Sequence, residues 1–272
     1  MSENKIKLFT LYGLAGAITA ISVLPIFWLA LGAFKSDIGM KTIPPVAPNF
    51  TDWSLIFEFI TQYYPFIFNS LFVTIGSTIL CLLLAVPMAF GLVNFKLRGE
   101  NLIADWILST RMMPPIAAAV PLFIIFNGLG MVNSHTALLI AYTGFNLPFA
   151  IWVSMTFIRK VPKELIEAAR VEGATWFETL VFIVVPVSLS GIATTATFVF
   201  IFAWNEFLLA LFLTSQETRT LPVVISSFVG TGRIYWSNIA IATVIQSIPP
   251  IIFAFAMQRH IVSGMTMGAV KD

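Results

Sequence analysis

Long uncharged runs of hydrophobic residues dominate the chain, and charged residues gather in the segments between them. The first run extends from Leu8 to Phe34 and is bounded by Lys7 and Lys35. A helix that crosses the hydrocarbon core of a bilayer needs about 20 apolar residues, whereas the apolar core of a secretory signal has only about 7–15. The first run therefore predicts a membrane span that is retained in the mature protein.

Five more runs of this kind follow, and they predict five more spans. Membrane-spanning β-strands would be about 10 residues long with alternating polarity. These runs are longer and continuously apolar, so we expect helices. The predicted fold class is an all-α integral membrane protein with six transmembrane helices in a single domain, residues 1–272. The predicted spans cover approximately residues 8–34, 66–95, 102–126, 136–158, 187–213 and 234–258.

The composition agrees with this pattern. Hydrophobic residues make up 58% and charged residues 10% of the chain, and the mean hydropathy is +0.92. Soluble proteins carry about 25% charged residues, so a water-soluble enzyme, a disordered chain and a disulfide scaffold are excluded. The single cysteine, Cys81, lies in an apolar run, where we expect a small buried or lipid-facing residue. The 15 Lys and Arg residues are spread over the whole chain and indicate no nucleic-acid-binding surface.

The distribution of Lys and Arg predicts the orientation, because the cytoplasmic segments of membrane proteins are enriched in both. With the N-terminus inside, ten of them lie in inner segments and four in outer segments; Arg111 lies within a span and is not counted. We therefore expect both termini in the cytoplasm, with residues 159–186 as the long inner segment. The inner residues are Lys5, Lys7, Lys96, Arg98, Arg159, Lys160, Lys163, Arg170, Arg259 and Lys271, and the outer residues are Lys35, Lys41, Arg219 and Arg233.

The inner segment 159–186 is patterned as two short helices joined at a glycine. Pro162 suits the first turn of a helix, and Gly173 stands where a helix ends in the left-handed conformation. Thr175 and Glu178 have the spacing of a capping box that opens a second helix. Acidic and basic residues balance between 159 and 178, so the segment is no polybasic lipid anchor. On these residues alone, an ordinary interfacial loop is an equally good interpretation.

The same segment carries a longer motif. It contains Glu167-Ala168-Ala169, three residues, Gly173, nine residues, Ile183, one residue, and Val185-Pro186. This spacing resembles the EAA loop of ABC importer permeases, whose pattern is E-A-A-x3-G-x9-I-x-L-P. Val185 stands where the family has Leu, a change that stays apolar. Four further motifs are similar to the carbohydrate-uptake branch (maltose/trehalose/polyol type, second permease), so that the resemblance covers essentially the whole chain: Thr110-Arg111-Met112-Met113-Pro114-Pro115, Leu147-Pro148-Phe149-Ala150, Phe202-Ala203-Trp204-Asn205-Glu206 and the tail from Ser263 to Lys271.

The resemblance implies a type I importer permease (MetI-like) fold with cytoplasmic termini, in a prokaryotic cytoplasmic (inner) membrane. It implies that the chain and a second homologous permease form an alternating-access path for a sugar, such as a monosaccharide, disaccharide or polyol. An extracytoplasmic binding protein delivers the sugar in such importers. The EAA helix docks on a cytoplasmic ATPase dimer, which binds ATP and Mg. The residues implied for ATPase coupling are Glu167, Ala168, Ala169, Gly173, Ile183 and Pro186.

The chain itself is expected to hold no cofactor and to have no enzymatic activity of its own, because it contains no G-x-x-x-x-G-K-[ST] sequence for binding ATP. Four polar residues within the predicted spans are candidates for the solute path: Arg111, Asn146, Asn205 and Glu206. Polar residues in spans also bond neighbouring helices together, and the sequence leaves both interpretations open. We expect no metal site, since the two histidines lie near opposite faces of the membrane.

Three other functions are compatible with a multi-pass chain. The first is an ABC importer permease for a non-sugar solute, such as an organic anion or amino acid. The second is a stand-alone secondary transporter, which often has interrupted spans at corresponding positions of its two halves; no such pair is evident here. The third is an intramembrane enzyme, for which paired catalytic residues at one depth are missing.

Overall fold

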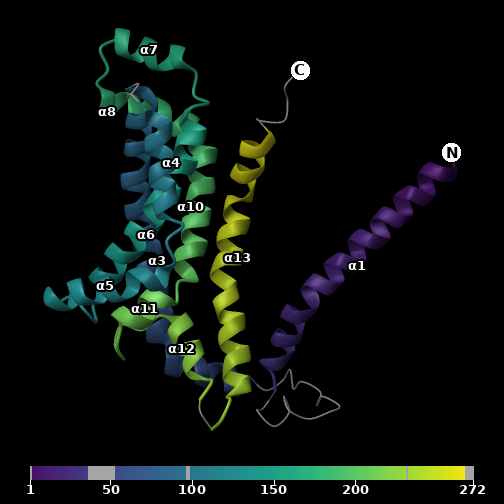
Figure 1. The fold of residues 1–272 in the computed structure, drawn as a ribbon. Coiled ribbons are helices and arrows are strands. Elements are labelled where there is room, and N and C mark those ends of the chain that lie inside the picture. The colour runs from purple at the N-terminus through teal and green to yellow at the C-terminus, as the bar shows by residue number, and fades with distance from the viewer. Residues whose placement is uncertain (1, 36–52, 96–98, 231, 267–272) are drawn as a thin grey trace. The chain divides into compact units, whose positions relative to one another are not determined.

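The computed structural model in Figure 1 describes residues 2–35, 53–95, 99–230 and 232–266. The described residues are almost entirely helical, with one isolated bridge between Val229 and Ile234 in place of strands. The predicted all-α fold class is therefore confirmed. Lys41, which the sequence assigns to an outer segment, and the end of the C-terminal tail motif lie outside the described residues.

Four single helices are long and apolar enough to cross a membrane. They are α1 (Ser2–Gly32), α3 (Ser54–Asn94), α6 (His135–Ile158) and α13 (Trp236–Thr266). In α1, an 18-residue hydrophobic window within Thr10–Gly32 has none of its residues buried inside the protein. An apolar helix surface of this extent is stable in contact with lipid.

Two further candidate spans are bent pairs of helices. The helices α4 (Glu100–Thr110) and α5 (Pro115–Gly128) meet at an angle of 79°, and the segments Trp176–Val187 and Leu189–Trp204 (the latter α10) meet at 82°. Six spans result if each bent pair counts as one. The third predicted span, residues 102–126, corresponds to the bent pair α4 and α5.

The break in the third span has a local cause. Pro114 and Pro115 have no backbone N–H groups, and a residue before proline avoids the helical conformation. The last turn of α4 tightens, since Met112 N–H bonds to the Ser109 carbonyl oxygen and Met113 N–H to that of Thr110. The helix α5 then begins with proline at its first position, where a missing N–H costs nothing.

The fifth predicted span is also divided. The helix α10 ends at Trp204, and the short helix α11 (Leu208–Leu213) follows after the turn at Asn205–Phe207. The remaining elements are α7 (Lys163–Val171), α8 (Trp176–Glu178), the π-helical turn η1 (Thr179–Val184), α9 (Val185–Val187) and α12 (Leu221–Ser227).

Contacts between residues divide the chain into two compact units. Unit 1 comprises Met1–Tyr64 and Val224–Ile248, and unit 2 comprises Pro65–Val223 and Pro249–Asp272. Within unit 1, the rings of Phe59, Tyr63 and Phe228 pack together with centroid distances of 4.6–6.0 Å.

Unit 2 contains the residues of interest for function. Its helices α4 and α10 both pack against α6, and α11 packs against α5 and α6. The approach of α10 to α6 requires glycine, because a Cβ at Gly191 would lie 2.1 Å from Cγ of Phe157. One hydrophobic core joins the C-terminal half of α3 to α6 and the inner segment; it includes Ala89, Phe90, Ile151, Met155, Ile158, Ile166, Leu180 and Val184. A second core joins α3, α5, α6 and α11; it includes Val73, Ala119, Phe126, Leu138, Tyr142, Leu209 and Leu213.

Candidate functional site

The inner segment, residues 159–186, lies at one end of the helices of unit 2, with α7 and α8 beyond the ends of α3, α4, α6 and α10 (Figure 1). The helix α7 begins after Pro162, with Glu164 in its first turn and Arg170 in its last, as its macrodipole favours. It is amphipathic: Ile166 and Ala169 are buried. The opposite face exposes Leu165, Ala168 and Val171. We call these three residues, together with the exposed ring of Phe177, the apolar inner face.

The end of α7 has the hydrogen bonds of a Schellman motif. Gly173 adopts a φ of +93°, its N–H bonds to the Arg170 carbonyl oxygen (3.2 Å), and the Ala174 N–H bonds to that of Ala169 (3.0 Å). The Arg170 guanidinium donates a further bond to the Ala174 carbonyl oxygen. The predicted turn at Gly173, which we call the elbow, is therefore present. Backbone hydrogen bonds and a bond from the Arg170 side chain both hold it.

The capping box predicted at Thr175 is also present. Thr175 Oγ1 accepts a bond from the Glu178 N–H (3.2 Å), and Glu178 Oε2 accepts one from the Thr175 N–H (2.7 Å) and one from its hydroxyl (2.8 Å). These donors stabilise the carboxylate and lower the pKa of Glu178. Beyond it the chain forms the π-helical turn η1, where the sequence predicts regular helix. Turns of this kind occur often at functional sites.

Trp176, which is not among the residues predicted for coupling, holds the turn at Gly173 to the end of α3. The Trp176 ring lies 4.9 Å from the ring of Phe95 and 6.2 Å from that of Phe90, at the end of α3. The Arg170 guanidinium carbon lies 4.5 Å from the Trp176 ring centre on the other side of the elbow. Cation–π contacts of this kind are worth about 0.5–2 kcal/mol. The spacing of Arg170 and Trp176 across a glycine gave no recognised signal for this pairing.

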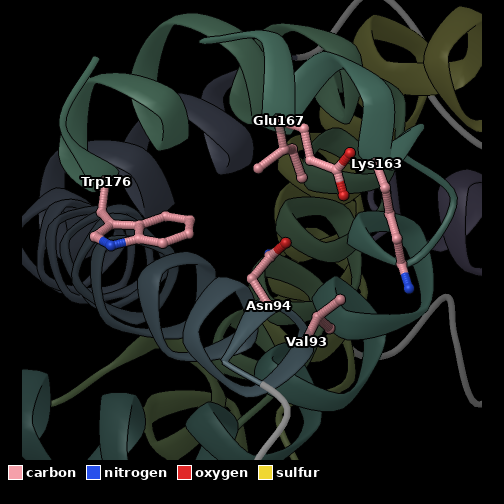
Figure 2. Close-up of a pocket in the computed structure, with 6 residues that line it drawn as sticks. Val93, Asn94, Lys163, Glu167 and Trp176 are labelled. Carbon is pink, nitrogen blue, oxygen red and sulfur yellow. The ribbon is translucent and has the colours of Figure 1, made fainter. Parts of the chain in front are cut away.

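A pocket of about 160 Å³ lies between α7 and the end of α3. In Figure 2 the Glu167 carboxylate, the Asn94 amide and the Trp176 ring border this hollow from three sides. The other lining residues are Val93, Lys163 and Ile166. The Glu167 carboxylate is therefore at an accessible, partly polar opening rather than inside the protein.

The six residues implied for coupling do not share one surface. Glu167 and Ala168 are exposed, and Gly173 is exposed at the elbow. Ala169, in contrast, is buried against the protein's own core and is only 9% exposed. Ile183 is half-buried in η1, and Pro186 is exposed in α9. Ala168 thus faces outward while its neighbour Ala169 lets α7 lie close to the rest of the protein.

The structure brings two of the four polar candidates within the spans together. Arg111 is the C-cap of α4 at the break before α5. Its Nη1 donates to the Phe145 carbonyl oxygen (2.5 Å) and to Asn146 Oδ1 (2.9 Å), both on α6. Its guanidinium carbon lies 4.9 Å from the centre of the Phe202 ring on α10.

The other two candidates lie at the turn between α10 and α11. Glu206 Oε1 accepts a bond from the Leu209 N–H (3.0 Å) and so caps the start of α11, and the Tyr142 hydroxyl bonds to the Glu206 carbonyl oxygen (3.2 Å). Asn205 is exposed, and its amide donates to the Ile201 carbonyl oxygen of its own helix.

A further polar cluster, absent from the sequence predictions, ties α3 and α6 to the segment after α11. The Asn69 amide donates to the backbone carbonyl oxygens of Glu217 (2.9 Å) and Arg219 (3.1 Å), and its oxygen bonds to Nε2 of His135 (2.8 Å). The neighbouring Asn133 accepts bonds from the same segment, at the Ser215 N–H and the Thr218 hydroxyl. These contacts join residues far apart in sequence, so spacing gave no signal for them.

Comparison with known proteins identifies a matching family and several similar permeases. Residues 81–267 match the family model described as binding-protein-dependent transport system inner membrane component. The chain is 35% identical over 254 residues to the probable ABC transporter permease protein y4oR of Sinorhizobium fredii, covering 92% of this chain and 91% of the relative. It is 33% identical over 276 residues to the trehalose/maltose transport system permease protein MalG of Thermococcus litoralis, covering 100% and 99%.

Among solved structures, the chain resembles one from a bacterial ABC transporter involved in the import of the acidic polysaccharide alginate. The TM-score is 0.76 at 19% sequence identity, and the match covers 96% of this chain and 98% of that chain. At this identity the likeness concerns the fold alone.

Proposed function

The chain belongs to the family of binding-protein-dependent transport system inner membrane components, the permeases of ABC transporters, and we propose that it is the permease subunit of an ATP-driven sugar importer in a prokaryotic inner membrane. In this proposal it forms, with a second permease, an alternating-access path for a sugar that an extracytoplasmic binding protein delivers. The ATPase dimer supplies ATP hydrolysis and holds ATP and Mg.

The observation that carries the proposal is the build of the inner segment. Its two short helices are joined by a glycine in the left-handed conformation and by a capping box, so a force applied to α7 reaches α9 and α10 without being lost in a flexible loop. The helix α7 also packs against η1, and Ile166, Leu180 and Val184 belong to one buried core. A stiff element anchored in this way is suited to transmitting rigid-body motion.

The apolar inner face supports an ATPase as the docking partner. Val171 is 89% exposed and Phe177 is 72% exposed, although both lie in a segment expected on the cytoplasmic side, in water. Val171 ends α7 and Phe177 lies in α8. Exposed large apolar residues gathered in one short segment indicate a protein interface. In this proposal the face enters a groove of the ATPase, and Glu167 supplies a charged contact at its margin.

The sugar class rests on relatives. The trehalose/maltose permease of Thermococcus litoralis aligns over the whole chain, which supports a sugar such as a disaccharide. A non-sugar solute, such as an organic anion or amino acid, is the alternative. In the sugar proposal the exposed Asn205 is the polar candidate available to a path between the two permeases, whereas Arg111 and Asn146 bond to each other.

Purification of the tagged chain from its native cell in mild detergent, with identification of every co-purifying protein, tests the assembly. The proposal predicts a cytoplasmic ATPase and a second, different permease. Sugar-loaded binding protein is then expected to stimulate ATP hydrolysis by the reconstituted complex. Recovery of the chain alone, with solute movement in liposomes that needs no ATP, would refute the proposal and favour a secondary transporter.

A charge reversal at Glu167 tests the coupling role. We expect Glu167→Lys to leave the complex folded while abolishing stimulated ATP hydrolysis and uptake. Asp105→Lys is the matched control, because Asp105 is exposed near the same end of unit 2 but lies outside the inner segment. Equal uptake by the Glu167→Lys variant and the wild type would remove Glu167 from the docking surface.

A further inference from the structure

Two of the polar groups within the spans serve a purpose other than binding solute. We propose that Arg111 is a positioning residue, received by Asn146, which fixes the bend of the third span against α6 and makes no contact with solute. The transport part of the argument rests on the proposed function, whereas the structural part stands without it.

The break between α4 and α5 leaves the third span without a continuous helix to hold its direction. Two prolines in sequence end the helix and leave a bend of 79° between its halves. Within a membrane, helix-breaking prolines are tolerated where neighbouring helices hold the freed backbone groups. The residue placed at the break is Arg111, whose long side chain reaches across to α6.

The groups on α6 that receive Arg111 lie beside a second proline. Pro148 removes the N–H that would bond to the Gly144 carbonyl, so α6 is weakened at this level. The adjacent Phe145 carbonyl oxygen accepts its bond from Arg111. Asn146 is 4% exposed, and its amide group is held in turn by the Tyr142 carbonyl oxygen (2.9 Å). The acceptor oxygen of Asn146 is therefore fixed in direction before Arg111 meets it.

The guanidinium is also covered on its face. The Phe202 ring of α10 lies against it at 4.9 Å, and Phe149 of α6 packs against the same ring at 5.1 Å. A cation with carbonyl acceptors at its edge and an aromatic ring on its face is held from two directions. Arg111 thus ties three elements together: the break, α6 and α10.

The turn between α10 and α11 is bonded to the same stretch of α6. The Tyr142 hydroxyl bonds to the backbone of Glu206 between α10 and α11, one helical turn from Asn146. Glu206 itself caps α11 through Leu209. The helix α6 therefore acts as a common support for both interrupted spans, which explains polar groups at this depth without a solute.

Spin-label distance measurement on the assembled complex in lipid nanodiscs tests the positioning role. Labels at Leu102→Cys and Leu129→Cys, in a Cys81→Ala background, mark the two ends of the bent span. We expect a narrow distance distribution in the wild type. In Arg111→Met and Asn146→Ala the distribution broadens and its mean moves toward the roughly 40 Å that a straight helix between these positions would span.

The controls separate lost contacts from general damage. Thr156→Ala removes a hydroxyl that bonds only within α6, to Trp152, and is expected to leave the distribution narrow. Arg111→Lys and Asn146→Asp keep a cationic donor and an acceptor oxygen, and are expected to stay close to the wild type. A narrow, unshifted distribution in Arg111→Met would overturn the proposal.

Uptake supplies a readout that distinguishes positioning from solute contact. In Arg111→Met, uptake of any two transported solutes is expected to fall by the same factor, about tenfold for the loss of a charged hydrogen bond. A changed preference between the two solutes would show that Arg111 touches solute and would also overturn the proposal. If the wild-type complex moved no solute, the proposed function would fail while the distance measurement still decided the role of Arg111.

Discussion

The elbow at Gly173 offers a clean test of how the inner segment is built. A Cβ added there meets nothing within 4 Å, so the cost of a side chain comes from the backbone alone. For an L-residue the left-handed conformation costs about 1–2 kcal/mol. Asn tolerates that conformation better than Ala, and a β-branched residue tolerates it worst. From the most to the least stable elbow, the expected order of residues at position 173 is therefore Gly, Asn, Ala and Val.

Hydrogen exchange measures this cost directly. The N–H groups of Gly173 and Ala174 close the Schellman motif, so they exchange only when the elbow opens. A destabilisation of 1–2 kcal/mol raises the population of open states about 5- to 30-fold. We expect exchange of these amides in Gly173→Ala to accelerate by this factor, with Gly173→Asn between it and the wild type.

The same series connects the elbow to coupling. Binding-protein-stimulated ATP hydrolysis is expected to fall in the order in which exchange accelerates, while the melting temperature of the transmembrane part changes little. An equal loss of stimulated ATP hydrolysis in Gly173→Asn and Gly173→Val would refute the backbone argument, because it would show that any side chain at this position is harmful. Unchanged exchange in Gly173→Ala would refute it as well.

Three further predictions concern contacts around the elbow and the spans. Trp176→Ala should lower the stability of the inner segment by about 1–3 kcal/mol, measured by its hydrogen exchange, while Trp176→Phe keeps the ring contacts and much of the protection. Because hydrogen bonds from Thr175 lower the pKa of folded Glu178, their stabilisation is complete above the unfolded-state pKa of about 4.3. It is lost as pH falls through the lower folded-state pKa, so protection of residues 175–178 should decline there in the wild type. In Glu178→Gln the neutral amide oxygen still accepts the Thr175 bond but does not titrate, so protection should be flat with pH. Gly191→Ala should lower the melting temperature through overpacking worth about 1–3 kcal/mol, and Phe157→Leu in the same chain should recover part of the loss.

Features decided by near neighbours in sequence were predictable. The left-handed Gly173 and the reciprocal bonds of Thr175 and Glu178 depend on residues within a few positions, and both were expected and found. The number of apolar runs likewise leads to up to six spans, because length and hydropathy alone determine which segments can cross a membrane. The orientation of the termini remains a prediction.

Features decided by distant partners were not predictable. The contact of Arg111 with Asn146 joins residues 35 positions apart, and that of Asn69 with Glu217 joins residues 148 apart. The division of the third span has a local cause in Pro114-Pro115, but it was not predicted, because the apolar run continues on both sides. The π-helical turn η1 has no sequence pattern that separates it from α-helix.

Photo-crosslinking from two neighbouring positions of α7 tests the central claim most directly. A photoreactive amino acid replaces Ala168 in one version of the assembled complex and Ala169 in another. Ala168 is exposed beside Glu167, whereas Ala169 is buried against the protein's own core. The account predicts a crosslink to the cytoplasmic ATPase from position 168 and none from position 169. Crosslinks to the ATPase from 169 alone, or from neither position in an actively transporting complex, would contradict it.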